Sequence, residues 1–161
     1  MSARTLVVGV FQNPDSLDPG QTGLITVDQM LLTMFDPLLW KFPNDPTYYP
    51  GLAESWTISP DATIYTFKLR KGVTFHDGTH FNAAAVKATF DHIVDPATRS
   101  LSAIGDIGPY KKTVVIDDFT AKVVFKSPNA AFINEMVQGI FGISSPTALR
   151  KYGKEYSKHP V

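Results

Sequence analysis

The 161-residue sequence contains no cysteine and no long apolar run, and neither sign of charge predominates. The absence of cysteine excludes disulfides and thiolate sites, but it leaves the redox compartment undetermined. No stretch of eighteen apolar residues occurs, which argues against a membrane-spanning segment. Fifteen basic residues balance fifteen acidic residues. The composition therefore gives no reason to expect a nucleic acid or another polyanion as a partner.

The amino-acid composition is typical of a folded domain. Hydrophobic residues make up 43% and charged residues 19% of the chain, which are globular rather than disordered values. No secretory apolar segment precedes the first predicted strand, so export would require a signal that has been removed. The last four residues, Lys158 to Val161, complete no predicted element. We therefore expect the chain to be a piece of a longer protein.

One stretch, residues 51–91, organises the predicted fold. Alternation of apolar and polar residues predicts strands, and Pro, Asp and Gly mark turns. The elements are a strand at 56–58, a turn at 59–62, a strand at 65–69, a tight turn at Asp77-Gly78, and a helix from Ala83 to about Val94 that Asn82 caps.

Further elements are predicted on both sides of this stretch. A capping box from Thr26 to Gln29, with Ile25 and Met30 as a hydrophobic staple, predicts a helix that ends at Pro37. Gly139 is expected to end another helix as its C′ residue. The others are strands at 6–10, 38–40 and 140–144, a hairpin of 114–116 and 121–125 around Asp117-Asp118, helices that begin at Asn129 and Ser145, and a loop region at 96–110.

Catalytic and metal-binding patterns are weak. His76 and His80 have a spacing that suits zinc on a helix, but Asp77-Gly78 between them favours a turn. No nucleophile elbow and no phosphate-binding loop occurs. Asp117-Asp118 is better explained as hairpin turn chemistry than as an acid–base pair. The residue patterns predict no catalytic residue, no metal site and no cofactor.

Aromatic residues make up 12% of the chain, and five of them cluster around prolines. Aromatic clusters bind flat or apolar ligand groups, although packing is the commoner role. Both interpretations stay open for this cluster, which consists of Trp40, Phe42, Tyr48, Tyr49 and Trp56.

Four motifs follow one another along the chain, namely Phe35-Asp36-Pro37-Leu38-Leu39, Pro50-Gly51-Leu52-Ala53-Glu54-Ser55-Trp56, Tyr65-Thr66-Phe67-Lys68-Leu69-Arg70-Lys71-Gly72-Val73 and Phe75-His76-Asp77-Gly78-Thr79. In this order they resemble the family 5, or oligopeptide-binding, extracytoplasmic solute-binding proteins of ABC transporters. The resemblance covers essentially the whole chain, and it includes the segments 15–19 and 145–153. Family members are several times longer.

The resemblance implies an α/β fold of the type II periplasmic-binding-protein kind, in which two lobes close on a ligand. Residues 1–36 and 140–161 would be pieces of lobe one. Residues 37–139 would form an intact inserted β-rich, α+β subdomain with a mixed or antiparallel sheet flanked by helices. The second lobe would be absent, and the bilobal fold therefore incomplete.

This chain departs from the family pattern at two positions. Asp61-Ala62 stands where the family usually has Asp-Gly, and Asn82 stands where it usually has Thr followed by an acidic residue. Asn82 still provides a cap, whereas the capping box is lost. We expect these changes to affect stability rather than function.

Ligands of open α/β sheets lie beyond the carboxyl ends of strands and near helix N-termini. Applied to the fold that the resemblance implies, this rule predicts a ligand surface in the loop 13–16, at the helix start 26–28 and at the strand end 141–144. The residues expected to contact ligand are Asn13, Asp15, Ser16, Thr26, Asp28, Phe141, Gly142 and Ser144.

By resemblance, the whole protein would capture a peptide or another small solute and deliver it to an ABC importer permease. It would be periplasmic or at the cell surface, and it would meet the membrane only through the permease or a lipid anchor. Two alternatives stay open. One is an enzyme or sensor that uses His76 or Asp117-Asp118, and the other is an interaction module that self-associates.

Overall fold

The computed structural model describes residues 7, 9, 10 and 12–161. The strand predicted at 6–10 lies partly outside these residues, and its described members Val7, Gly9 and Val10 belong to no strand. No helix in the described part of the chain is both long and apolar enough to cross a membrane.

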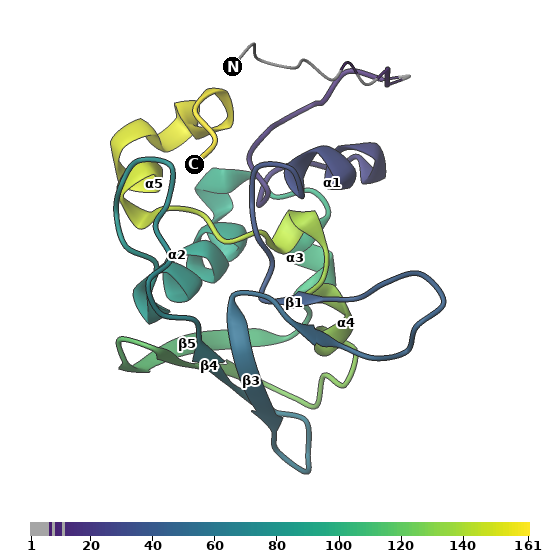
Figure 1. Ribbon diagram of the computed structural model, residues 1–161, viewed down its shortest axis with the longest axis vertical. Coiled ribbons are helices and arrows are strands. Elements are labelled where there is room, and N and C mark those ends of the chain that lie inside the picture. The colour runs from purple at the N-terminus through teal and green to yellow at the C-terminus, as the bar shows by residue number, and fades with distance from the viewer. Residues whose placement is uncertain (1–6, 8, 11) are drawn as a thin grey trace, which may run out of the picture.

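A four-stranded antiparallel sheet forms one layer, with the strand order β3-β4-β6-β5 (Figure 1). Both predicted hairpins are confirmed. Trp56 pairs with Phe67, and Tyr65 pairs with Val123, so the apolar positions of neighbouring strands share one face. The strands are β3 (Ala53–Ile58), β4 (Ile64–Leu69), β5 (Tyr110–Asp117) and β6 (Thr120–Phe125).

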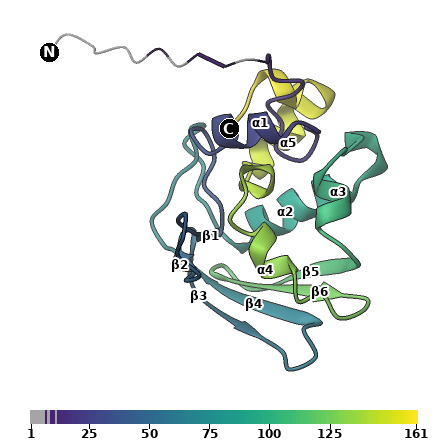
Figure 2. The same ribbon diagram turned by 90° about the vertical axis from the view of Figure 1, so that its right-hand side faces the viewer.

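Helix α2 (Ala83–Val94) packs on the apolar face of this sheet, and the other face is open (Figure 2). The Asn82 side chain accepts a hydrogen bond from the backbone N–H of Ala84, so the predicted cap is confirmed. The helix ends at Val94, and its C-cap Asp95 is extended, as expected of a residue before proline. Its inward residues Val86, Phe90 and Ile93 are fully buried, at the spacing of an amphipathic helix.

Phe132 lies at the centre of the core. Its ring makes edge contacts with Tyr65, Phe90 and Phe125, at centroid separations of 5.0, 5.9 and 4.7 Å. Such aromatic pairs contribute about 0.5–1.5 kcal/mol beyond their buried area. These three ring contacts join the sheet, helix α2 and the short helix α4 (Phe132–Glu135) into one core.

The helix predicted from Asn129 is shorter than expected, because α4 begins only after Ala131. The Asn129 side chain donates to the backbone oxygen of Ile107 instead of capping the helix. The prediction that Gly139 ends this helix as its C′ residue is also wrong, since Gly139 begins a separate 3-10 turn.

Helix α1 (Ile25–Leu31) begins earlier and ends earlier than predicted. Its N-cap is Leu24, which has extended backbone and no side-chain cap, so the capping box at Thr26 is not formed. The physical reason lies in the preceding loop, where the Thr22 hydroxyl accepts from the backbone N–H of Leu24 and fixes the entry into the helix.

The strand predicted at 140–144 is replaced by the 3-10 turn η2 (Gly139–Phe141) and an unpaired segment. Two glycines explain the difference, because each touches α1 or the turn after it. A Cβ on Gly139 would lie 2.5 Å from the backbone oxygen of Asp28, and one on Gly142 would lie 2.5 Å from Cβ of Phe35. Close packing against α1 thus replaces strand pairing here.

The remaining elements connect these layers. Strand β1 (Leu39–Trp40) pairs with β2 (Tyr49–Pro50) in a small separate hairpin. The predicted Ser145 cap is confirmed, since its hydroxyl accepts from the backbone N–H of Ala148. The other elements are η1 (Pro96–Thr98), α3 (Ala103–Asp106), α5 (Pro146–Tyr152) and η3 (Gly153–Lys158).

Candidate functional site

The eight residues predicted to contact ligand occupy different environments. Asn13 and Asp15 are exposed, and Thr26 and Asp28 are half-buried. The other four are buried within this chain, namely Ser16, Phe141, Gly142 and Ser144. Of the predicted set, the loop that contains Asn13 and Asp15 therefore offers the most accessible side chains.

The Asp15 carboxylate closes this loop on itself. One oxygen accepts from the Thr22 hydroxyl at 2.5 Å, and the other accepts from the backbone N–H of Gly23 at 2.8 Å. Burial acts to raise the pKa of Asp15, but these bonds and one from the backbone of Ser16 outweigh it and lower the pKa. Asp15 is thus an exposed, ionised acceptor in a fixed position.

Leu101 lies directly beside this loop, although no sequence pattern pointed to it. A Cβ on Gly23 would lie 3.1 Å from Cβ of Leu101 and 3.7 Å from the Asp15 carboxylate. The Leu101 side chain is nevertheless 66% exposed. We call the surface made by Asn13, Asp15, Gly23 and Leu101 the Asp15–Leu101 surface. It combines a charged acceptor with an accessible apolar side chain.

Sequence reasoning missed Leu101 because residues 96–110 show no periodicity that indicates which side chains turn outward. Tertiary contacts bring the segment to the loop. The backbone N–H of Ser102 donates to the oxygen of Thr22, and the Gln21 side chain donates to the oxygen of Thr98.

The helix start at 26–28 faces the interior rather than the Asp15–Leu101 surface. Asp28 accepts a hydrogen bond at 3.0 Å from the backbone N–H of Ile140, which is 112 residues away. Burial raises the pKa of Asp28, and backbone hydrogen bonds from Ile140 and Gly139 oppose that rise. The hydroxyl oxygen of Thr26 is buried without a hydrogen-bond partner in the described structure.

The segment 141–144 is part of the core in this chain. The Phe141 ring contacts Phe90 edge-on at 6.5 Å, and the backbone N–H of Ser144 donates to the Thr89 hydroxyl at 3.0 Å. Ligand contact by this segment stays a prediction.

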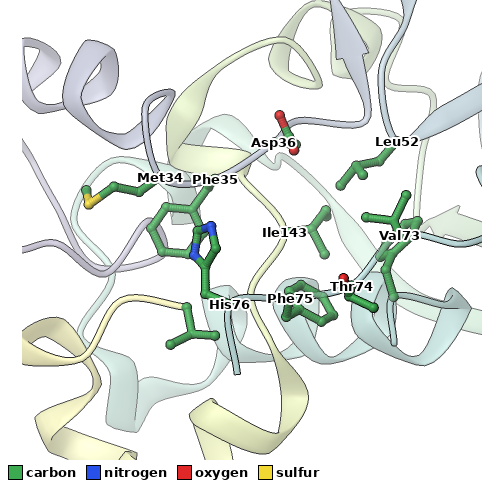
Figure 3. A pocket seen from close by; sticks show the side chains of 11 residues that line it. Met34, Phe35, Asp36, Leu52, Val73, Thr74, Phe75, His76 and Ile143 are labelled. Carbon is green, nitrogen blue, oxygen red and sulfur yellow. The ribbon is translucent and has the colours of Figure 1, made fainter. Parts of the chain in front are cut away.

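A small cavity of about 50 Å³ lies between the end of the α1 region, the segment 73–76 and Ile143 (Figure 3). Most of the side chains that line it are apolar, and Asp36 and His76 line it as well. Pockets for drug-sized ligands occupy about 300–1,000 Å³, so this cavity has room for water rather than for a peptide. Its lining includes Met34, Phe35, Leu52, Val73, Phe75 and Ile143.

The sequence predicted turns both at the segment with His76 and His80 and at Asp117-Asp118, and the observed geometry fits both. Gly78 has φ +81°, and its N–H bonds to the oxygen of Phe75, so the segment containing His76 and His80 is a turn rather than a helix. Asp117 accepts from the backbone N–H of Phe119 and from the Thr120 hydroxyl, as turn chemistry requires. Among the described residues, no group of three or more metal-binding side chains converges.

The predicted aromatic cluster lies mostly on the β1–β2 hairpin. Phe42 contacts Tyr49 at 5.4 Å and is 57% exposed. Tyr48 donates its hydroxyl to Asn134, and Lys41 lies 4.9 Å above the Tyr48 ring. Packing accounts for these contacts, and a ligand role for the hairpin stays a prediction.

This chain belongs to the bacterial extracellular solute-binding proteins, family 5, whose model matches residues 47–161. The chain is 42% identical over 160 residues to the glutathione-binding protein GsiB of Shigella flexneri serotype 5b. It is 41% identical to the protein of the same name from Escherichia coli K12. Each match covers 99% of this chain and 31% of the relative. The chain thus spans about a third of the length of these relatives.

Solved structures share the fold. A periplasmic oligopeptide-binding protein from Borrelia burgdorferi superposes with a TM-score of 0.78 at 27% identity, over 89% of this chain and 32% of that one. AgaA of A. tumefaciens R10, in complex with agropinic acid, gives 0.77 at 30% identity, over 86% and 28%. The predicted fold class, that of a type II periplasmic binding protein with mixed α/β structure, is confirmed.

Proposed function

We propose that this chain is the N-terminal portion of an extracytoplasmic solute-binding protein that captures a peptide-like solute for an ABC importer. The observation that carries the proposal is the 42% identity to a glutathione-binding protein across 99% of this chain. Glutathione is itself a small peptide-like solute with carboxylate, amine and thiol groups. A periplasmic or cell-surface location and a permease partner are parts of the same proposal.

The division into subdomains belongs to this proposal. Residues 37–139 contain the whole four-stranded sheet and the helix that covers it, which supports their being an inserted subdomain. Residues 1–36 and 140–161 would be pieces of lobe one. Contacts between α1 and η2, including that of Asp28 with Ile140, support the grouping of residues 1–36 with residues 140–161.

Within this chain, the Asp15–Leu101 surface is the part that we assign to the solute. Asp15 is a fixed acceptor that suits an ammonium or amide N–H group. Leu101 offers an apolar contact that becomes more favourable as a second lobe excludes water. Binding and closure would be the entire function, with no chemical step.

Calorimetric titration of the complete protein that carries this chain tests the solute class. We expect glutathione or a dipeptide such as Met-Leu to bind, and a free amino acid to bind much more weakly. A protein that is folded by circular dichroism but binds none of these peptides would contradict the proposal.

Two matched variants test the surface itself. Leu101→Ala and Ile116→Ala each shorten an exposed side chain, at 66% and 51% exposure, so neither is expected to change stability by more than about 0.5 kcal/mol. We expect only Leu101→Ala to weaken solute binding. If the two variants bound solute with equal affinity, Leu101 would not be part of the solute-binding site.

A further inference from the structure

A buried cluster of His92, Asp18 and Thr98 joins the loop of the Asp15–Leu101 surface to the end of helix α2. The His92 Nε2 atom lies 2.8 Å from Oδ2 of Asp18. Its Nδ1 atom lies 3.1 Å from Oγ1 of Thr98. The side chain of Asp18 is only 6% exposed and that of His92 is 21% exposed, so both groups are largely withdrawn from water.

The Thr98 hydroxyl lies near two atoms of His92 and has one hydrogen to donate. Oγ1 of Thr98 lies 2.5 Å from the carbonyl oxygen of His92, and a carbonyl has no hydrogen to give. The Thr98 hydroxyl must therefore donate its only hydrogen to that oxygen. Its contact with Nδ1 of His92 is then a hydrogen bond only when Nδ1 carries the proton.

The other ring nitrogen faces the Asp18 carboxylate. Oδ1 of Asp18 accepts from the backbone N–H of Gly20 at 2.9 Å, which leaves Oδ2 as the acceptor toward His92. A carboxylate oxygen only accepts, so the Nε2–H group of His92 is the donor of this bond.

Neighbouring elements fix the position of the His92 ring. His92 lies in the last turn of α2. Tyr156 of η3 contacts the ring edge-on at 6.2 Å, and a Cβ on Gly20 would lie 3.1 Å from the ring carbon Cδ2.

The two other acids near the end of this helix have partners of their own. Asp91 accepts from Lys87 and from the Tyr110 hydroxyl, and Asp95 caps η1 through the backbone N–H of Ala97. Asp18 is thus the acid that faces His92.

We propose that His92 is a positioning residue, whose Nε2–H group holds the 15–23 loop in place through Asp18 and thereby presents the Asp15–Leu101 surface. Asp18 transmits the effect, because its carboxylate and carbonyl accept hydrogen bonds from the backbone N–H groups of Gly20, Gln21 and Thr22. Without the His92 ring, the Asp18 carboxylate loses this partner and the loop loosens. The role in solute capture rests on the proposed function, whereas the hold on the loop does not.

NMR of the 15N-labelled protein tests the proposal without any solute. We expect the Nε2–H proton of His92 to be observed and protected from exchange with water, because it is bonded to Asp18. The backbone amides of Gly20, Gln21 and Thr22, which donate to Asp18, should be protected as well. A His92 ring whose Nε2 carries no proton, or rapid exchange of these three amides, would overturn the proposal.

Variants separate the hold on the loop from a general loss of folding. His92→Gln should speed exchange of these three amides on the order of tenfold or more, and Thr98→Val should speed it less because Asp18 keeps its partner. His80→Gln, at an exposed residue, should leave it unchanged. Unchanged exchange in His92→Gln would overturn the proposal. If that variant does not fold, the state of the His92 Nε2–H group in the wild-type protein still decides the matter.

Discussion

The hydroxyl of Ser145 donates a hydrogen bond to the carboxylate of Asp77 at 2.6 Å, across 68 residues of sequence. The same hydroxyl accepts from the backbone N–H of Ala148 and so caps helix α5. The turn at 75–79 and helix α5 are therefore held together through one oxygen atom.

Removing that oxygen should destabilise the protein. Ser145→Ala loses a helix cap, which costs about 0.5–2 kcal/mol, and it also removes a donor to Asp77. We expect the midpoint of urea unfolding to fall by a corresponding amount. Ser127→Ala, at an exposed position, serves as the control and should leave the midpoint unchanged. Equal midpoints for the two variants would contradict the assigned role.

Acidification should weaken the same contact. Burial acts to raise the pKa of Asp77, but hydrogen bonds from Ser145 and Thr79 outweigh it, so its pKa lies below the ordinary value of 3.8. A lowered pKa contributes stability that is present above 3.8 and is lost as the pH falls through the folded-state value. We expect this loss to be smaller in Ser145→Ala when unfolding free energies are compared across that acidic range.

Asp28 should respond to pH in the opposite direction. Because burial raises its pKa above 3.8, its contribution to stability is largest below that pH and is lost as the pH rises through the folded-state value. Asp28→Ala should cost about 1–3 kcal/mol, since the buried N–H of Ile140 loses its acceptor. Asp28→Asn keeps an acceptor and should cost less. Urea unfolding of both variants at neutral pH checks the order, and a costlier Asn variant would contradict it.

Ala62 adopts φ +51° in the turn between β3 and β4, in the left-handed region where a side chain costs about 1–2 kcal/mol. This strain gives a physical reason for the glycine that the family resemblance implies there. Ala62→Gly should raise the thermal unfolding temperature, because relief of strain exceeds the added entropy of the unfolded chain. Gly72→Ala, at φ +74°, is the reverse test and should lower it. An unchanged or lower temperature for Ala62→Gly would count against strain at this turn.

Gly142 should not tolerate a methyl group, because its Cβ would lie 2.5 Å from Cβ of Phe35. We expect Gly142→Ala to cost about 1–3 kcal/mol in unfolding free energy, as overpacked cores do. Gly105→Ala is the matched control, since a Cβ there meets no atom within 4 Å and lies in helix α3. A destabilised control with an unaffected Gly142 variant would refute this packing argument.

Local patterns predicted the parts of the fold whose contacts are themselves local. Both hairpins and the caps at Asn82 and Ser145 form where the residues indicated, since turn chemistry and capping involve neighbours a few residues apart. The capping box at Thr26 failed because Thr22, fastened by Asp15, sets the helix entry instead. The strand expected at 140–144 failed because two glycines let this segment pack against α1.

The candidate site could be predicted only in part. The sequence and its family resemblance pointed to the loop with Asn13 and Asp15, which the fold leaves exposed. They did not point to Leu101, because exposure and proximity to Gly23 depend on contacts between segments about eighty residues apart.

By itself, the sequence determined both hairpins, the caps at Asn82 and Ser145 and the family, because these depend on alternation, turn residues and ordered motifs along the chain. Only the tertiary structure decided which predicted ligand residues are accessible and that Leu101 joins Asp15. It also decided that His92 faces Asp18 and that Ser145 reaches Asp77. Each of these relationships is a contact between distant segments, and packing of the whole core, rather than any local pattern, brings such segments together.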